Sequence, residues 1–406
     1  MDPRLLPPGV LPSQLLASAI DDGWIEAGDS PVPPRNIQPA SLDLRLGNVA
    51  YRLRCSFLPD NEPVEQALRR YTTERVSVRQ QGIILEQNRP YLIPLVERLS
   101  LPAGVRAKAS PKSSTGRLDI FTRVISDNNF MFDEIPDGYH GPLYLEVVSR
   151  TFPVRVLPGL SLNQLRLMTG RSSLTDEEIA ALHASTPLLF RDGRARPPEQ
   201  IAVSNGLFMA LDLGRPGGHE LVGYSAKEDS TVLDLSKVSH YQARSFWDEV
   251  LSEPGEHGAR IILRPEKFYL LLSLDRLRIP PGYAAEMTAY DPTSGELRTH
   301  YAGFFDPGFG HDPDPAGRQG SRVALEVRAH DVPFAVEHGQ NICKFSFEKM
   351  AQCPDRLYGS ALDSNYQGQE VALSKHFKRD RPGHAGRRDG QRGYAQPGLF
   401  PLAVNG

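Results

Sequence analysis

The chain has 406 residues, and its 46 Lys and Arg against 49 Asp and Glu give a formal net charge of −3. This length exceeds one ordinary domain and fits two, and the near-neutral charge offers no global basic field for nucleic acid. No uncharged apolar run approaches the ~20 residues that a membrane span needs. We therefore expect neither a nucleic-acid nor a membrane partner.

Cysteine usage and the start of the chain indicate the compartment. The cysteines are Cys55, Cys343 and Cys353, which cannot all pair, and no C-x-x-C occurs. This pattern disfavours a disulfide scaffold and a thiolate zinc site. Prolines interrupt the N-terminus where a signal peptide needs an unbroken apolar stretch. We predict a reducing, cytoplasmic location.

In chain order, residues 11–28 predict a short amphipathic helix, and short apolar runs joined by Pro- and Gly-containing turns follow. Residues 171–203 predict a second helix and an exposed linker, with Thr175 as the N-cap and Glu178 completing a capping box. A third helix is predicted over 240–252. Because the remaining runs are short and often alternating, the chain is predicted to be mainly β with a few short helices.

An internal repeat is the most informative feature of the sequence. One pair of segments ends in a similar turn that contains Pro and Gly, and a second pair carries Leu-Glu-Val. The matching segments follow one another in the same order in both halves. The matching segments are 89–105 with 267–283, 145–159 with 325–339, and, more weakly, 41–47 with 208–214. The repeat predicts two copies of one β-rich domain.

The repeat sets the expected domain limits. We predict an N-terminal β domain over 1–170, a helix and linker over 171–203, and a C-terminal β domain over 204–373. Residues 374–406 carry seven Lys and Arg against two Asp, a net charge of +5 (7 − 2), and are rich in Gly. We expect this last segment to be a disordered basic tail.

A short turn over 111–118, PKSSTGRL, could bind a polyphosphate. It offers backbone N–H groups, hydroxyls and cations in one loop. The residues concerned are Lys112, Ser113, Ser114, Thr115, Gly116 and Arg117. Loops of this composition are usually only turns, so the segment alone is a weak signal.

A second candidate is HYAGFFDPGFG over 300–310, which predicts a strand, a tight turn and a returning strand. Small residues at Ala302 and Gly303 would let a flat ring approach the backbone closely. Asp306 at the turn would have carboxylate oxygens free for a sugar hydroxyl. An Asp-Pro-Gly turn without function remains the simpler interpretation.

Two glutamates, Glu146 and Glu326, each stand among apolar residues in the sequences YLEVV and ALEVR. A carboxylate in such a strand either points to solvent or is held inward for a purpose. Recurrence in both repeats favours a functional role for at least one of them.

Taken together, these segments resemble the dCTP deaminase family of the trimeric dUTPase-like fold. The resemblance rests on SSTGR, the Asp-Pro-Gly hairpin, Leu-Glu-Val, IQPASLDLRLG over 37–47 and YGSALDSNYQGQ over 358–369. It covers roughly 11–170 and 204–373 and is similar to a long, duplicated form of the family. It implies two tandem dUTPase-like domains of β-barrel or jelly-roll type, and a homo-oligomer.

The resemblance implies hydrolytic removal of the C4 amino group of dCTP, which gives dUTP and ammonia. The family uses a glutamate without zinc, and this sequence has no H-x-E with P-C-x-x-C to hold a zinc-bound water. The carboxylate must then move protons between water, the ring and the leaving amine. Mg²⁺ is expected through the triphosphate of the substrate.

The resemblance also implies roles for single residues. The serine and arginine that contact substrate and attacking water correspond to Ser113 and Arg117. The tyrosine and glutamine of the segment that covers the nucleotide correspond to Tyr358 and Gln369. Asn365 stands where the family has a phosphate-binding lysine, for which Lys375 or Lys378 could substitute.

Neither repeat carries a whole set of these residues. In the first, IPDGYHG has Pro136 where the family has its sugar-binding Asp, with Asp137 one residue late. In the second, the turn reads DPTSGELR over 291–298. The family builds each site between neighbouring subunits, so we predict a composite site. It would combine residues of the first repeat with residues of the second: Ser113 and Arg117 with Ala302, Asp306 and Glu326.

Two alternatives remain open from the sequence. The first is a dUTP diphosphatase, or an enzyme that performs both deamination and diphosphate release. The second is a non-catalytic nucleotide sensor, suggested by the incomplete half-sites. Sensor function predicts triphosphate binding without turnover.

Overall fold

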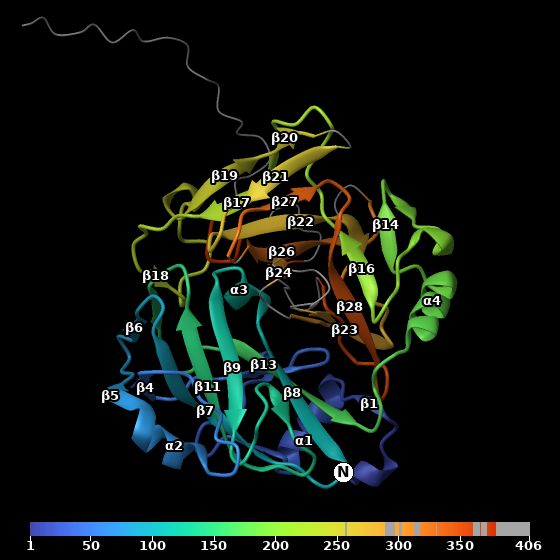
Figure 1. Ribbon diagram of the computed structural model, residues 1–406. Helices are drawn as coiled ribbons and strands as arrows, with labels where there is room; N and C mark the ends of the chain where they lie inside the picture. Colours follow the sequence, from blue (N-terminus) through green and yellow to red (C-terminus); the bar gives the residue numbers. More distant parts are fainter. Residues whose placement is uncertain are drawn as a thin grey trace, which may run out of the picture.

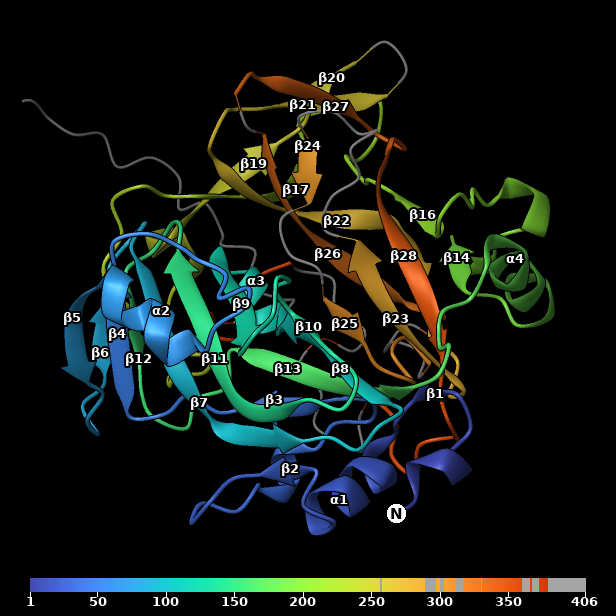
Figure 2. The same cartoon turned by 60° about the horizontal axis from the view of Figure 1, so that its bottom comes forward.

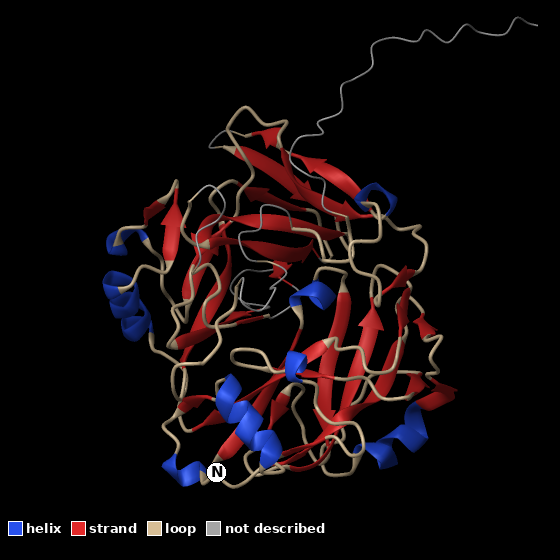
Figure 3. Ribbon diagram, turned by 180° about the vertical axis from the view of Figure 1, so that it is seen from behind, coloured by secondary structure: helices blue, strands red, loops and turns tan. Residues whose placement is uncertain are grey.

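The computed structural model describes residues 1–255, 258–288, 297–299, 303–311, 317–329, 331–359, 366 and 372–378, with the backbone alone at 297–299. Strands dominate, and the few short helices lie at the periphery or between the two halves (Figure 3). The mainly β prediction is confirmed. No helix in the described part of the chain is long and apolar enough to cross a membrane.

The first half of the chain contains three α-helices and thirteen strands among its described residues. The helices are α1 (Ser13–Asp21), α2 (Val64–Tyr71) and α3 (Ser113–Gly116). The strands are β1 (Gly9–Val10), β2 (Ile25–Glu26), β3 (Leu42–Leu44), β4 (Val49–Leu53), β5 (Thr72–Ser77), β6 (Ile83–Leu85), β7 (Pro90–Ser100), β8 (Val105–Pro111), β9 (Ile120–Ser126), β10 (Glu134–Ile135), β11 (His140–Ser149), β12 (Val154–Val156) and β13 (Asn163–Thr169).

The second half begins with helix α4 (Asp176–Ser185) and continues almost entirely in strands. These are β14 (Leu189–Arg191), β15 (Arg194–Ala195), β16 (Leu207–Ala210), β17 (Leu221–Ala226), β18 (Leu233–Asp234), β19 (Trp247–Leu251), β20 (Glu253–Pro254), β21 (Ala259–Leu263), β22 (Phe268–Leu277), β23 (Tyr283–Thr288), β24 (Leu297–Thr299), β25 (Phe304–Phe305), β26 (Ser321–Ala329), β27 (Phe334–Glu337) and β28 (Asn341–Lys349). Short 3-10 helices lie in the connections: η1 (Pro3–Leu5), η2 (Pro34–Asn36), η3 (Pro198–Gln200) and η4 (Ala243–Ser245).

The strand order repeats, as the sequence echoes predict. The first repeat has a sheet β5-β4-β7-β11-β9, and the second has β19-β17-β22-β26-β24. Around β13 the order β13-β8-β10 likewise matches β28-β23-β25 around β28. Even the register agrees, because Glu146 pairs with Leu92 and Glu326 pairs with Leu270. Figure 1 shows the first repeat in blue to green below the second in yellow to red.

The helix predicted within 171–203 is confirmed, with Thr175 and Glu178 forming the capping box. The segment does more than connect the repeats. Strand β14 pairs with β22 as β2 pairs with β7, and α4 precedes β14 as α1 precedes β2. We therefore propose that this segment belongs to the second repeat, rather than to a linker.

The prediction of a helix over 240–252 is wrong. Residues Ala243–Ser245 form one turn of 3-10 helix, and Trp247–Leu251 form β19, which pairs with β17. The rings of Phe246 and Trp247 pack against Phe152 of the first repeat. Tertiary pairing and this aromatic contact override the local helical preference.

The prediction of a disordered tail from residue 374 is wrong for residues 374–378. Ser374, His376 and Phe377 are buried, and the Phe377 ring packs edge-on against Phe246. The residues that follow Lys378 lie outside the described residues. Aromatic and apolar contacts thus hold at least 374–378 in the core that both repeats share.

The two repeats join through a mixed apolar and charged interface. Strand β18 of the second repeat adds to β12 of the first, so one sheet crosses the boundary. Arg166, which is fully buried, donates to the carbonyls of Ala285 and Phe305 and pairs with Glu348 at 3.2 Å. A buried guanidinium satisfied in this way fixes the geometry of one repeat against the other.

Candidate active site

The turn PKSSTGRL forms α3, one helical turn at the junction of the repeats, close to β26 (Figures 1 and 2). The Thr115 hydroxyl donates to the Leu162 carbonyl at 2.9 Å, and the Ser374 hydroxyl donates to the Ser114 carbonyl at 3.0 Å. The first bond lies within the first repeat, and the second connects α3 to the C-terminal segment. They hold α3 with Gly116 facing the second repeat.

Glu326 of β26 lies directly against this turn. A Cβ atom placed on Gly116 would be 2.7 Å from Glu326 Oε2, so only glycine leaves room for the carboxylate. Glu326 is 5% exposed. Burial raises its pKa to about 8, against the opposing charge of Arg117 and with the help of Asp119. Among the described residues, no side chain forms a hydrogen bond or ion pair with this carboxylate.

Arg117 lies at the end of the same turn and meets the C-terminal segment. Its guanidinium stacks on the ring of Tyr366, 3.7 Å from the ring centroid. It also donates to the carbonyls of Ala372 and Leu373 at 3.2 and 3.4 Å. Segment 372–378 of the second repeat therefore closes over residues of the first, and Tyr366 is one residue from the predicted Asn365.

The Asp-Pro-Gly hairpin brings Asp306 to the same junction. Asp306 is buried, and its Oδ1 pairs with Arg166 at 3.3 Å, so the carboxylate is not wholly free as expected from the sequence. Burial raises the pKa of Asp306, and the Arg166 charge opposes that rise. Gly303 is buried beside the hairpin, and its backbone carbonyl accepts from Met287 N–H.

The predicted covering segment is described only in part. Tyr358 N–H donates to the Pro307 carbonyl at 2.8 Å, and its ring packs on Phe309. The Tyr358 hydroxyl accepts from Tyr366 N–H at 3.3 Å, and burial raises the pKa of Tyr358. The predicted residues Ala302, Asn365 and Gln369 lie outside the described residues.

The second candidate carboxylate, Glu146, occupies a different environment. It is 1% exposed, pairs with Arg123 at 3.2 Å and accepts from the Ser56 hydroxyl at 2.9 Å. Arg123 stands directly opposite Glu146 in β9. Arg123 and Ser56 thus both bond to the Glu146 carboxylate, whereas no described side chain bonds to that of Glu326.

Helix α2, which the sequence analysis did not predict, covers the face that bears Glu146. Leu68 and other apolar side chains of α2 form a cluster with Leu92, Ile125 and Tyr144, the neighbours of Glu146 on that face. The matching face of the second repeat packs against the first repeat instead. The available signal for this helix was the helical spacing of the apolar residues Val64, Ala67, Leu68 and Tyr71 among charged residues.

Asp137, the displaced acid of the first repeat, also lies away from Glu146. It is exposed, and its Oδ1 accepts from Gly104 N–H at 3.0 Å. The first repeat therefore does not bring an aspartate and a glutamate together, whereas Glu326 and Asp306 of the second repeat both face the first.

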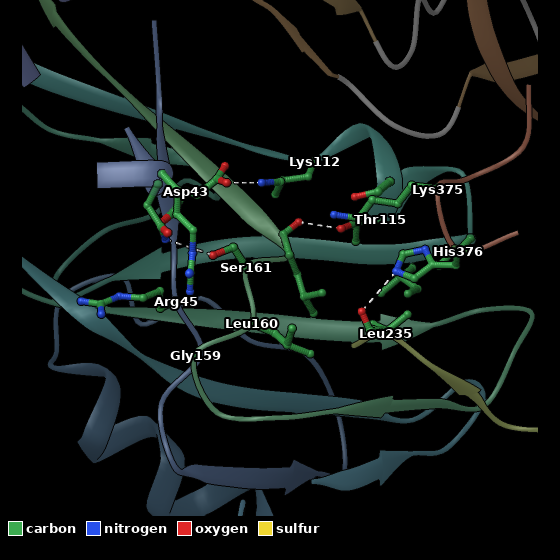
Figure 4. A pocket seen from close by; sticks show the side chains of 16 residues that line it. Asp43, Arg45, Lys112, Thr115, Gly159, Leu160, Ser161, Leu235, Lys375 and His376 are labelled. Carbon is green, nitrogen blue, oxygen red and sulfur yellow. Dashed lines mark hydrogen bonds and ion pairs between the residues drawn. The ribbon is translucent and has the colours of Figure 1, made fainter. Parts of the chain in front are cut away.

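A cavity of about 240 Å³ opens beside α3 (Figure 4). Lys112, Thr115 and Lys375 line one side of it, and Lys112 forms an ion pair with Asp43. Burial and the nearby Lys112 lower the pKa of Lys375, for which no described acidic side chain is an ion-pair partner. The His376 Nε2–H donates to the Leu235 carbonyl at 3.2 Å, and burial lowers the pKa of His376 to about 4. Among the residues that line the cavity, Arg35, Arg45, Lys112 and Lys375 stand against one acid, Asp43, so the cavity is cationic.

The fold and this junction place the protein in a class of β proteins with two repeats, in which a buried carboxylate of one repeat lies against a turn of the other. The model of the 2′-deoxycytidine 5′-triphosphate deaminase N-terminal domain matches residues 7–171, and that of the C-terminal domain matches 175–377. The chain belongs to the 2′-deoxycytidine 5′-triphosphate deaminase family.

Solved and curated relatives agree with this assignment. The chain is similar to the crystal structure of 2′-deoxycytidine 5′-triphosphate deaminase from Agrobacterium tumefaciens, with 42% identity and a TM-score of 0.75, covering 84% of this chain and 99% of that one. It is 31% identical to a dUMP-forming dCTP deaminase of Tropheryma whipplei, over 37% of this chain and 72% of the relative. It is 30% identical to a dCTP deaminase of Halorubrum lacusprofundi, over 34% of this chain and 68% of the relative.

Proposed function

We propose that the protein is an enzyme that deaminates dCTP to dUTP and ammonia. Family membership supports the reaction. The observation that carries the proposal is the position of Glu326, a buried carboxylate of the second repeat against Gly116 and Arg117 of the first. A carboxyl with a pKa of about 8 exchanges protons readily near neutral pH.

In the proposed mechanism, Glu326 takes a proton from water as the oxygen attacks C4 of the base. It delivers this proton to the ring nitrogen, then takes the second proton of the former water from the hydroxyl on C4 and passes it to the departing amine. Water is thus consumed and ammonia released. Ser113 and Arg117 orient the attacking water and the base, and Ala302, Gly303 and Asp306 seat the base and the sugar. Tyr358, Asn365 and Gln369 belong to the segment that covers the nucleotide. No zinc is required in this mechanism.

The triphosphate is proposed to extend from α3 into the cationic cavity. Lys112, Ser114, Thr115 and Gly116 offer cations, hydroxyls and backbone groups there, and Lys375 is the cation without a described acidic partner. Mg²⁺ would enter with the triphosphate and would offset part of its negative charge. Lys375 thus takes the role of the family's phosphate-binding lysine, in whose position this chain has Asn365.

Replacing Lys375 by alanine should raise the KM for dCTP about tenfold with little change in kcat, because one charge-assisted phosphate contact is lost. Steady-state kinetics at several dCTP concentrations measure this effect. Lys378→Ala is the matched control, because Lys378 is three residues away and exposed. Equal KM values for the two variants would remove Lys375 from the phosphate site.

The second candidate function is a bifunctional enzyme that also releases diphosphate from dUTP. It is supported because relatives named dUMP-forming and relatives named only dCTP deaminase match this chain at nearly equal identity. Pure protein should be incubated with dCTP and Mg²⁺ and the nucleotides separated. Accumulating dUTP supports deamination alone, and dUMP with diphosphate supports both steps. Binding without either product would favour the nucleotide sensor and contradict the proposed enzyme.

The setting of the enzyme is also proposed. A cytoplasmic homo-oligomer, with a nucleotide substrate and without nucleic-acid or membrane partners, is supported by the resemblance to an oligomeric family and by the near-neutral charge. We propose that residues 1–170 and the segment up to 373 form the two domains. Light scattering of the purified protein gives the number of chains.

A further inference from the structure

Two charged residues stand two positions beyond the proposed catalytic pair. Asp119 follows Arg117 in the first repeat, and Arg328 follows Glu326 in β26. Because side chains alternate along a strand, Glu326 and Arg328 lie on the same face of β26. Each repeat therefore presents one acidic and one basic side chain to the other. The basic residue comes first in the first repeat, and the acidic residue comes first in the second.

Asp119 and Arg328 form a buried ion pair across the junction. Asp119 is fully buried, and its carboxylate also accepts from the Thr151 hydroxyl. Arg328 is buried as well, is 3.4 Å from Thr151 Oγ1 and donates to the Glu266 carbonyl. Both members of the pair are thus held from more than one side, which fixes their geometry.

The backbone at Asp119 is adapted to this contact. Asp119 has φ of 57°, in the left-handed region that Gly, Asn and Asp tolerate best. The reversal turns its carboxylate toward the second repeat immediately after α3. Its N–H donates to the Gly116 carbonyl at 2.9 Å, so the position of Asp119 is tied to the residue that contacts Glu326.

We propose that Asp119 and Arg328 are positioning residues for deamination, which set the separation of α3 from β26 and balance the charge around Glu326. This inference rests on the proposed function of Glu326. Neither residue is assigned contact with the substrate. Their paired charges act through Glu326 and Arg117.

The charged groups that face Glu326 come from both sides of the junction. Arg117 and Asp119 face it from the first repeat, and Arg328 follows it on its own strand. Leu270, its partner in β22, is apolar. Asp119 raises the pKa of Glu326, and the positive charge of Arg328, paired with Asp119, opposes that effect. Removing Asp119 leaves Arg328 with only the more exposed carboxylate of Glu266, at 3.6 Å, and removing Arg328 leaves the charge of Asp119 without its buried counter-charge. The two single replacements should therefore shift the pKa of Glu326 in opposite directions.

The test compares Asp119→Asn, Arg328→Gln and the double variant with the parent protein. Asn tolerates the left-handed backbone at position 119, and Gln keeps much of the arginine length. In Asp119→Asn the unbalanced Arg328 should lower the pKa of Glu326. In Arg328→Gln the unbalanced Asp119 should raise it. The double variant, with a neutral pair, should return toward the parent.

Two readouts follow the charge of Glu326. The first is the pH dependence of kcat for dCTP. The second is direct titration of Glu326 by NMR in protein labelled with ¹³C at glutamate Cδ, with the resonance assigned by its loss in Glu326→Gln. We expect opposite shifts of roughly half a pH unit or more in the single variants. The NMR arm needs no turnover, so a failure of the proposed function would appear only in the kinetic arm.

The proposal would be overturned if the pKa of Glu326 shifted in the same direction in both single variants. It would also be overturned if both variants lost activity while the titration of Glu326 stayed unchanged. In either case Asp119 and Arg328 would form only a structural ion pair. The double variant guards against a folding failure in the single variants, because it leaves no unpaired buried charge. If the double variant keeps kcat and its pH dependence while both single variants fold and titrate as the parent does, the positioning role is also excluded.

Discussion

Replacing Glu326 by glutamine should lower kcat for dCTP by ~10²-fold or more and leave nucleotide binding largely intact. Glutamine keeps the shape that fits against Gly116 but cannot carry a proton between water and the base. Steady-state kinetics combined with calorimetric titration of dCTP separate these two effects. Because Glu326 is buried and its pKa lies near 8, the parent enzyme also has the protonation equilibrium that this variant lacks.

Glu146→Gln is the matched control, since the same substitution is made at the same strand position of the other repeat. Its turnover per folded molecule should be near that of the parent. Its thermal stability should fall, because Arg123 loses its buried ionic partner. Abolished turnover in Glu146→Gln with retained turnover in Glu326→Gln would place the site in the first repeat and defeat the composite arrangement.

Replacing Gly116 by alanine should reduce kcat by a similar factor, on the order of 10²-fold, for a steric reason. The added methyl group would lie 2.7 Å from Glu326 Oε2, so either α3 or the carboxylate must move. Gly116 is in the last position of α3, where alanine is a better helix former, and the fold should be retained. Kinetics and a melting curve measured on the same sample distinguish displacement from unfolding.

Gly282→Ala is the control for this steric prediction. Gly282 lies in the turn before β23, and a Cβ atom there would have no neighbour within 4 Å. It should keep the parent kcat. Wild-type activity in Gly116→Ala would mean that α3 and Glu326 do not face each other in the working enzyme.

The repeat was predictable because it depends on local pattern. In both copies Leu-Glu-Val stands at the same distance before a Pro and a Gly, and Glu146 and Glu326 lie opposite equivalent leucines in the structure. The composite arrangement followed from which residues each copy lacked. The contact of Gly116 with Glu326 supports that prediction, and the variants above test the roles.

The contacts that set the environment of each glutamate could not be read from the sequence. Arg123, α2, Asp119 and Arg328 act across strands or across the repeats, where sequence separation gives no signal. The helix predicted over 240–252 failed for the same reason, because pairing with β17 determines its backbone. Local propensity decides an element only where tertiary contacts do not compete.

Helix α2 has a consequence for assembly. The contact between the repeats is head-to-tail, since α3 of one repeat meets the glutamate-bearing face of the next. Contacts of this kind close into a ring or continue as an open polymer. In the first repeat that face is already filled by the apolar side of α2. The helix therefore covers the face on which α3 of a further repeat would dock, so the contact seen between the two repeats cannot be extended at the first repeat.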